Sequence, residues 1–335
     1  MKAYITLDYE LFMGTKVGTI NNCLIKPMNA LTKMLDKYNI KCNIFVDAAY
    51  LLRLYQLKEN KQIEEQFQLV TQHIQNLSKQ GHAILFHFHP QWLYSKYEDG
   101  WIMDFEHYKI SDMPLEDIKI FIPQAIELLQ SYSCNKLKAF RAGGYSFPNE
   151  ACFGEILRKY EIDIDSSVLK GARVQSKYQS YDYANVPTKS PYRFDKDLSI
   201  IDNDGYFTEY PISTIKMLGF KYFFLKQSLT RRYNALFGHD KYGDGKGIGI
   251  AGNKSYRLIY KVKRLITPSV ISATIDGSFS LCLDYVYKKH CTAVNDNAFI
   301  IIGHPKNLSE KSISIFERFV MNHPEIKFGL FKSLN

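Results

Sequence analysis

The stretch "KQIEEQFQLVTQHIQNLSKQGHAILFHFHPQW" (residues 61–92) places a helix signal directly before a strand signal. Apolar residues recur at helical spacing up to Gly81, and glycine is a typical residue for the end of a helix. The following run of Ala, Ile, Leu and Phe predicts a buried strand. A helix that leads straight into a buried strand is the repeating unit of α/β folds with parallel sheets.

The same alternation continues on both sides of this stretch. The runs that predict strands lie at residues 2–11, 40–51, 83–92, 137–147, 162–169, 206–213, 297–308 and 326–331. The runs that predict helices lie at residues 27–38, 61–81, 115–132, 150–161 and 309–323. We therefore expect an α/β fold built on a parallel sheet or a β/α barrel.

The composition is that of a globular protein. Apolar residues make up 46% and charged residues 23% of the 335 residues. The six cysteines are scattered without CxxC spacing, which is typical of reduced thiols in the cytoplasm. The N-terminal run reads as a strand rather than a secretory signal, so we expect a cytoplasmic protein with a single domain over residues 1–335.

The net charge of +9 is concentrated in one segment. Between Lys221 and Ile266 the chain carries eleven Lys or Arg residues and two Asp residues, so this stretch accounts for the whole excess. Its Gly-rich centre, "YGDGKGIGIAGNK" (242–254), favours a loop, because no strand precedes it as a nucleotide-binding motif requires.

Residues 216–266 mix basic with aromatic and aliphatic side chains, and three interpretations compete. Nucleic-acid binding is the least supported, because no nucleic-acid-binding fold accompanies the segment, and we expect no nucleic-acid partner. A solvated basic subdomain over the barrel mouth and a contact with an anionic membrane or a lipid-linked sugar carrier both stay open.

Polar residues collect where the predicted strands end, which is where β/α folds place their active sites. They are Asp8, Glu10, His87, His89, Arg141 with Gly143 and Gly144, Asp163, Asp165 and His304. The two-residue period of a strand puts Asp8 on the face of Glu10, and His87 on the face of His89. Each residue alone has an ordinary structural explanation, but together they predict a metal site with groups for acid–base chemistry.

The order of these residues resembles the polysaccharide deacetylase superfamily, the NodB-homology or carbohydrate esterase family 4 group. The motifs that carry the resemblance are "TLDYE" (6–10), "GHAILFHFHPQW" (81–92), "FRAGGYSF" (140–147), "IDIDSSV" (162–168) and "IIIGHPKNL" (300–308). They span the chain apart from a variable insertion at residues 171–295. "FRAGGYS", "DSSV" and "GHPK" resemble the branch associated with surface polysaccharide biosynthesis.

The resemblance implies a distorted (β/α)7-type barrel with a basic insertion, and metal-dependent removal of an acetyl group from a sugar. It implies Asp8 as the base that activates water, Arg141 as the residue that keeps this base ionised, and His304 as the general acid. Asp165, or with less support Asp163, is then the partner of His304. The expected substrate contacts are Gly144, Trp92 and Tyr145, with a backbone N–H beside Tyr145 completing an oxyanion hole.

The metal ligands depart from the pattern of the family. A His-x-x-x-His motif would put the second histidine at Gln91, which is a poor ligand, so His89 is the natural replacement. Glu10 supplies the carboxylate by analogy, because Tyr9 stands where the family's second aspartate is common. Glu10, His87 and His89 are therefore the expected ligands of a divalent ion, Zn²⁺ first, with Co²⁺ or Ni²⁺ as alternatives.

The expected function is metal-dependent deacetylation of an N-acetylated sugar in cell-surface polysaccharide or glycolipid biosynthesis. The substrate would be free, nucleotide-linked, lipid-linked or polymeric, and the enzyme cytoplasmic or peripheral at the inner membrane face. A weak or inactive relative that binds a glycan or carrier lipid is the alternative, and a different metal-dependent hydrolase is a third interpretation.

Overall fold

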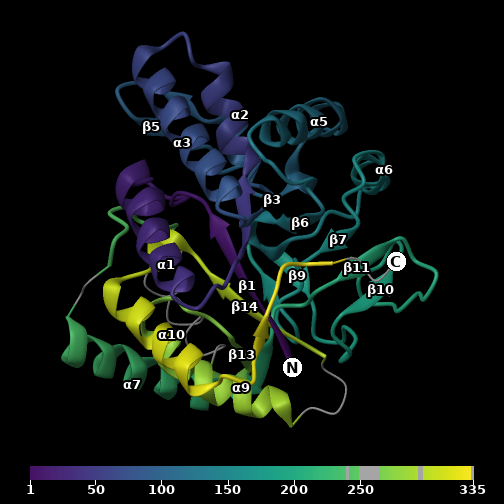
Figure 1. Cartoon of the computed structure of the whole chain (residues 1–335). Coiled ribbons are helices and arrows are strands. Elements are labelled where there is room, and N and C mark those ends of the chain that lie inside the picture. Colours follow the sequence, from purple (N-terminus) through teal and green to yellow (C-terminus); the bar gives the residue numbers. More distant parts are fainter. Residues whose placement is uncertain (239–240, 249–264, 293–296, 333–335) are drawn as a thin grey trace.

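The computed structural model describes residues 1–238, 241–248, 265–292 and 297–332. Its centre is a sheet in the order β10-β11-β7-β6-β3-β2-β1-β14, with β15 also paired to β1 (Figure 1). The strands are β1 (Lys2–Tyr9), β2 (Asn43–Asp47), β3 (Ala83–Phe88), β6 (Ala139–Ala142), β7 (Ile164–Asp165), β10 (Tyr192–Phe194), β11 (Phe207–Glu209), β14 (Ala298–Gly303) and β15 (Lys327–Phe328). Every pairing in this sheet is parallel except β10 with β11.

Helices surround the sheet, and the expected alternation of helix and strand is confirmed (Figure 1). They are α1 (Lys26–Asp36), α2 (Ala48–Gln56), α3 (Lys61–Lys79), α5 (Leu115–Ser131), α6 (Ala151–Lys159), α7 (Gly219–Phe237), α9 (Leu283–Cys291) and α10 (Glu310–Asn322). The shorter elements are η1 (Asn21–Ile25), α4 (Gln91–Tyr94), β4 (Lys96–Tyr97), β5 (Trp101–Ile102), η2 (Ile110–Asp112), η3 (Gly143–Tyr145) and η5 (Pro305–Asn307). In the described part of the chain, none of the helices is long and apolar enough to cross a membrane.

The two sides of the curled sheet are joined by irregular backbone. After β11, the N–H of Ile212 donates to Val168 at 2.8 Å, and the N–H of Ser213 donates to Ile300 in β14 at 3.1 Å. On the other side of Ser213, its carbonyl accepts from Ala273 at 2.7 Å. The fold is therefore a distorted barrel, as expected, with these segments in place of a regular closing strand pair.

Residues 171–295, which we expect to include a variable insertion, also contain part of the barrel. Strands β10 and β11 lie within these bounds and belong to the main sheet. The other described elements within these bounds are α7, η4 (Gly277–Cys282), α9 and two small antiparallel sheets. One sheet is the hairpin of β8 (Arg173–Gln175) and β9 (Ser180–Asp182), and the other pairs β12 (Thr214–Met217) with β13 (Ser269–Ser272), which follows α7 in the chain. Of the basic stretch 216–266, residues 239–240 and 249–264 lie outside the described residues.

Candidate active site

A cavity of about 430 Å³ lies where β1, β3, β6 and β14 end. Its charged and imidazole groups are Asp8, Glu10, His87, His89, Lys177, His304 and Lys306. The expected convergence of strand ends is therefore what the structure shows. Parallel strands put their carboxyl ends at the same rim, so residues far apart in sequence meet there.

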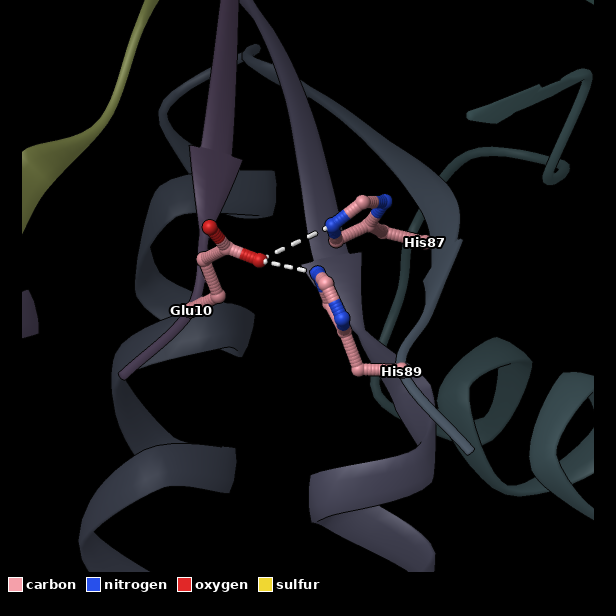
Figure 2. Close-up of side chains that lie close together, drawn as sticks. All are labelled: Glu10, His87 and His89. Atoms are coloured by element: carbon pink, nitrogen blue, oxygen red, sulfur yellow. Dashed lines mark hydrogen bonds and ion pairs between the residues drawn. The ribbon is translucent and has the colours of Figure 1, made fainter. Parts of the chain in front are cut away.

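Glu10, His87 and His89 form one compact cluster, with their ligand atoms within 4.8 Å of one another. In Figure 2 both imidazoles point at the same carboxylate oxygen of Glu10. Oε2 of Glu10 lies 3.0 Å from Nε2 of His87 and 2.7 Å from Nε2 of His89. All three residues are buried, so the cluster is held by the barrel rather than by solvent-exposed loops.

The hydrogen bonds behind His87 show that the cluster fits a divalent cation. Nδ1 of His87 lies 2.7 Å from the carbonyl oxygen of Arg141, which can only accept, so Nδ1 carries a proton. A neutral His87 then presents a lone pair to the carboxylate of Glu10. The lone pair on Nε2 of His87 and the carboxylate of Glu10 are both acceptors, so they need a bound cation or a second proton on His87 between them. Two imidazoles and one carboxylate form a common ligand set for zinc and other first-row metals.

Lys306 is a buried member of the site that the sequence analysis missed. Its Nζ lies 2.9 Å from Oε1 of Glu10 and donates to the carbonyl of Leu11 at 2.7 Å. Burial raises the pKa of Glu10, but Lys306 and the two histidines outweigh burial and hold that pKa well below its ordinary value. The available signal was the lysine directly after the His-Pro dipeptide of the last strand end.

Asp8 and Arg141 form a buried ion pair at the floor of the cavity. Nη1 of Arg141 donates to Oδ1 of Asp8 at 2.6 Å, and Nη2 donates to Thr6 at 3.0 Å and to Ser166 at 2.9 Å. Burial raises the pKa of Asp8, but the charges of Arg141, His87 and His304 bring the pKa below its ordinary value. Asp8 is therefore an ionised carboxylate, and its Oδ2 lies 3.5 Å from Nε2 of His304.

The partner of His304 is Asp276, which corrects the expectation for Asp165. Asp276 precedes η4, and its Oδ2 accepts from Nδ1 of His304 at 2.6 Å. Its Oδ1 also accepts from the backbone N–H of His304 at 2.8 Å. Burial lowers the pKa of His304, but Asp276, Asp8 and Glu10 raise it to about 9. His304 is therefore protonated at neutral pH, as a general acid requires.

Asp165 lies behind the cavity and forms a buried carboxyl pair with Glu209 of β11. Its oxygens accept from the N–H and the hydroxyl of Ser167, both at 2.8 Å. Burial and the neighbouring carboxyl group raise the pKa of Glu209 well above its ordinary value. Glu209 therefore keeps its proton to higher pH than an exposed glutamate does. Asp163 is also buried, and neither aspartate lines the cavity.

The Gly-Gly-Tyr turn after Arg141 shapes the edge of the cavity. Gly144 has φ 60° and Tyr145 has φ 61°, a left-handed conformation that costs a tyrosine on the order of 1 kcal/mol. Both residues line the cavity, as expected. A Cβ atom on Gly143 would lie 2.8 Å from Nδ1 of His89 and 2.5 Å from the carbonyl of Phe88, so only glycine lets the imidazole pack there.

Trp92 is a core residue, which corrects its assignment as a substrate contact. Its side chain is 0% exposed and packs between Tyr50 and Trp101, with ring centroids at 4.5 Å and 5.1 Å. Gln91, also 0% exposed, does not line the cavity. The structure therefore brings His89 rather than Gln91 to Glu10. Helix α4 begins at Gln91 and turns both side chains away from the strand face.

The mouth of the cavity is formed by loops that the sequence analysis left unassigned. Tyr108 and residues 176–179 of the β8–β9 hairpin lie on the rim, together with Phe12, Gly247 and Ile248. Asp244 anchors the Gly-rich stretch, because it accepts from the N–H of Thr19 at 2.8 Å and from Asn22 at 3.1 Å. The described part of the basic segment therefore reaches the mouth of the barrel.

Comparisons with known proteins find no matching protein-family model and no matching curated protein. Among solved structures, the chain is similar to a protein from Mycobacterium smegmatis assigned as a polysaccharide deacetylase, with 13% identity and a TM-score of 0.47 over 97% of this chain and 85% of that one. It is also similar to the PuuE allantoinase, with 11% identity and a TM-score of 0.48 over 98% and 86% of the two chains. A family 4 acetyl xylan esterase from Clostridium thermocellum, in complex with cobalt, has 17% identity and a TM-score of 0.30 over 51% and 60%. All three sequence identities are below 20%.

Proposed function

We propose that this protein is a metal-dependent hydrolase that removes an acetyl group from an N-acetylated sugar. The observation that supports this function best is the meeting of a base and an acid across one cavity, with Oδ2 of Asp8 at 3.5 Å from Nε2 of His304. Arg141 holds the base ionised and Asp276 holds the acid protonated, each through a direct ion pair. Amide hydrolysis needs both states at once.

Glu10, His87 and His89 would hold the divalent ion, with zinc as our first choice and cobalt or nickel as alternatives. When bound, such an ion polarises the acetyl carbonyl and lowers the pKa of water. His87 is oriented for this task by the carbonyl of Arg141. The backbone of His89 is held by Asp47, whose carboxylate accepts from the backbone N–H of His89 at 3.1 Å.

Asp8 accepts the proton of the attacking water. Arg141 binds Oδ1 of Asp8, which leaves Oδ2 to face the cavity. His304 then donates the proton of Nε2 to the leaving nitrogen, and Asp276 stabilises the imidazolium until that transfer. We also propose that the N–H beside Tyr145 is a donor to the developing oxyanion, since the turn at Gly144 brings this backbone to the cavity edge.

We further propose that the substrate is a lipid-linked or nucleotide-linked precursor of a cell-surface glycan, deacetylated in the cytoplasm. The support is chemical. The rim combines aromatic rings of Tyr108 and Tyr178 with Lys177, a mixture suited to a sugar ring that carries a negatively charged group. The surface-polysaccharide motifs of the sequence point in the same direction.

The experiment that tests the function is acetate release from a panel of N-acetylhexosamine conjugates, with and without a chelator. We expect release that the chelator abolishes and that zinc or cobalt restores. In Asp8→Asn, release should fall by about 100-fold or more while the metal content stays unchanged. The exposed Glu155→Gln serves as a matched control. Full activity of Asp8→Asn would overturn the assignment of the base.

Lys306 favours a second candidate function, a glycan-binding protein without catalysis. Its ammonium group already neutralises Oε1 of Glu10 from within the fold. This candidate predicts that the purified protein holds no zinc, cobalt or nickel, that added metal changes nothing, and that N-acetylated glycans still bind. Metal analysis together with glycan-binding calorimetry separates it from the enzyme.

A further inference from the structure

We propose that the outward face of α7 docks on an anionic phospholipid surface. The helix follows β12 and lies at the outer edge of the molecule (Figure 1). The inference concerns a surface away from the residues of the candidate active site, so it does not need the proposed catalytic roles.

The inner face of α7 is used by the fold itself. Leu229 and Tyr233 are buried, and Tyr222 stacks on Phe279 of η4 with ring centroids 6.0 Å apart. The hydroxyl of Tyr233 also bonds to the hydroxyl of Ser309 beside α10. These contacts fix the rotation of the helix, so the side chains on the opposite face are held outward.

The outer face combines exposed aromatic rings with exposed cations. Phe220 is 47% exposed and Phe224, one turn later, is 63% exposed. Arg231 follows on the same line of the helix, and Lys221 and Arg232 flank it, all three exposed. Large apolar side chains held in water beside positive charge are typical of helices that lie in a membrane interface.

The charge on α7 favours an anionic partner. Residues 219–237 contain four Lys or Arg residues and no Asp or Glu. The nearby Asp284 of α9 already pairs with Lys288 and His323, at 2.6 Å and 2.7 Å. Anionic headgroups would neutralise the exposed charges of Lys221, Arg231 and Arg232, while the acyl boundary takes up the two phenyl rings.

The segment that follows α7 in the chain lies at the cavity. The described chain after α7 includes Gly247 and Ile248, which line the cavity mouth. If the substrate is lipid-linked, as the proposed function has it, a docked α7 keeps the mouth close to the surface where that substrate lies. This last step rests on the proposed function, whereas vesicle binding is measured without any substrate.

The test is co-sedimentation of the full chain with phosphatidylglycerol-containing vesicles and with neutral phosphatidylcholine vesicles. We expect binding to the anionic vesicles only, weakened at least about tenfold when salt rises from about 50 mM to about 500 mM. Phe220→Ser combined with Phe224→Ser, and Arg231→Gln combined with Arg232→Gln, should each lower the partition coefficient by about tenfold.

Two matched control variants distinguish binding through the proposed face from non-specific binding to vesicles. Leu115→Ser with Ile120→Ser removes two similarly exposed apolar side chains from α5, and Lys58→Gln with Lys61→Gln removes two exposed charges elsewhere. Both controls should bind vesicles like the parent, and circular dichroism should show all variants folded. No binding, equal binding to neutral vesicles, or equal losses in the controls would overturn the proposal. So would a dimer in light scattering that the Phe224→Ser change dissociates, because the face would then be an interface between two copies.

Discussion

The carboxylate of Asp276 accepts two hydrogen bonds from His304, one from the backbone N–H at 2.8 Å and one from Nδ1 at 2.6 Å. These two hydrogen bonds fix the imidazole ring so that its Nε2 faces Asp8 across the cavity. It also stabilises the protonated form of the imidazole, since the charge of Asp276 is the largest influence that raises the pKa of His304 to about 9.

Replacing Asp276 by Asn should move the alkaline limb of the activity profile to lower pH. The general acid must be protonated, so the rate falls as pH rises through the pKa of His304. Without the aspartate charge that pKa falls, and the rate near pH 8 should drop roughly tenfold or more while the rate near pH 6 changes little. Asp165→Asn is the control. A shift of the alkaline limb in this control, or none in Asp276→Asn, would contradict the pairing.

His89 and Gln91 can be distinguished by metal affinity. His89→Ala should weaken zinc binding by about 100-fold or more, because it removes one of three ligands, while Gln91→Ala should leave it within about twofold. Competition with a chromophoric chelator measures both affinities in the absence of substrate. Weakened binding in Gln91→Ala with intact binding in His89→Ala would reverse the assignment.

Gly143→Ala should distort the cluster of Glu10, His87 and His89 without replacing any of these three residues. The added Cβ would meet the His89 ring at 2.8 Å and the Phe88 carbonyl at 2.5 Å, so the imidazole must move. Zinc affinity should fall by about tenfold or more. Gly154→Ala in α6 is the matched control, because nothing lies within 4 Å of its added Cβ. Equal affinities in the two variants would show that His89 tolerates displacement.

The buried pair of Glu209 and Asp165 should make stability depend on pH. Because the pKa of Glu209 is raised in the folded state, its contribution is full below the ordinary glutamate pKa and is lost as pH rises toward the folded-state pKa. Glu209→Gln stays neutral, so its free energy of unfolding should fall less between about pH 5 and about pH 8 than that of the parent. Urea denaturation measures this difference. Glu155→Gln should follow the parent, and parallel curves for all three proteins would show that the pair holds no proton.

The strand ends were predictable because they follow from local periodicity. Asp8, Glu10, His87, His89 and Arg141 each close a buried run, and parallel strands bring such positions to one rim whatever the loops do. In the structure, His87 and His89 meet Glu10, and Arg141 pairs with Asp8.

The other features of the site could not be predicted from the sequence, and each has a physical reason. Asp276 ends the short alternating run "ISATID" (271–276), which the sequence analysis did not assign to a strand. The N–H of Ile275 donates to Ile302 of β14 at 3.1 Å, and this barrel closure brings Asp276 to His304. Tryptophan is a residue type that often contacts sugars, but α4 begins at Gln91 and directs the Trp92 side chain into the core. Strand β2 ends at Asp47 rather than at residue 51, because the Asp47 side chain caps α2.

The adjacency of β1 and β14 has a consequence for how the protein is made. Strand β1 carries the base and is synthesised before β14, which pairs with it from Lys2 to Leu7 and follows it by almost the whole length of the barrel. Until then β1 presents an unpaired edge, and unpaired edges are prone to wrong associations during synthesis. The proposed hydrolysis therefore cannot start before residues 297–308 have been synthesised and packed, because Asp8 meets His304 and Lys306 reaches Glu10 only in the closed barrel.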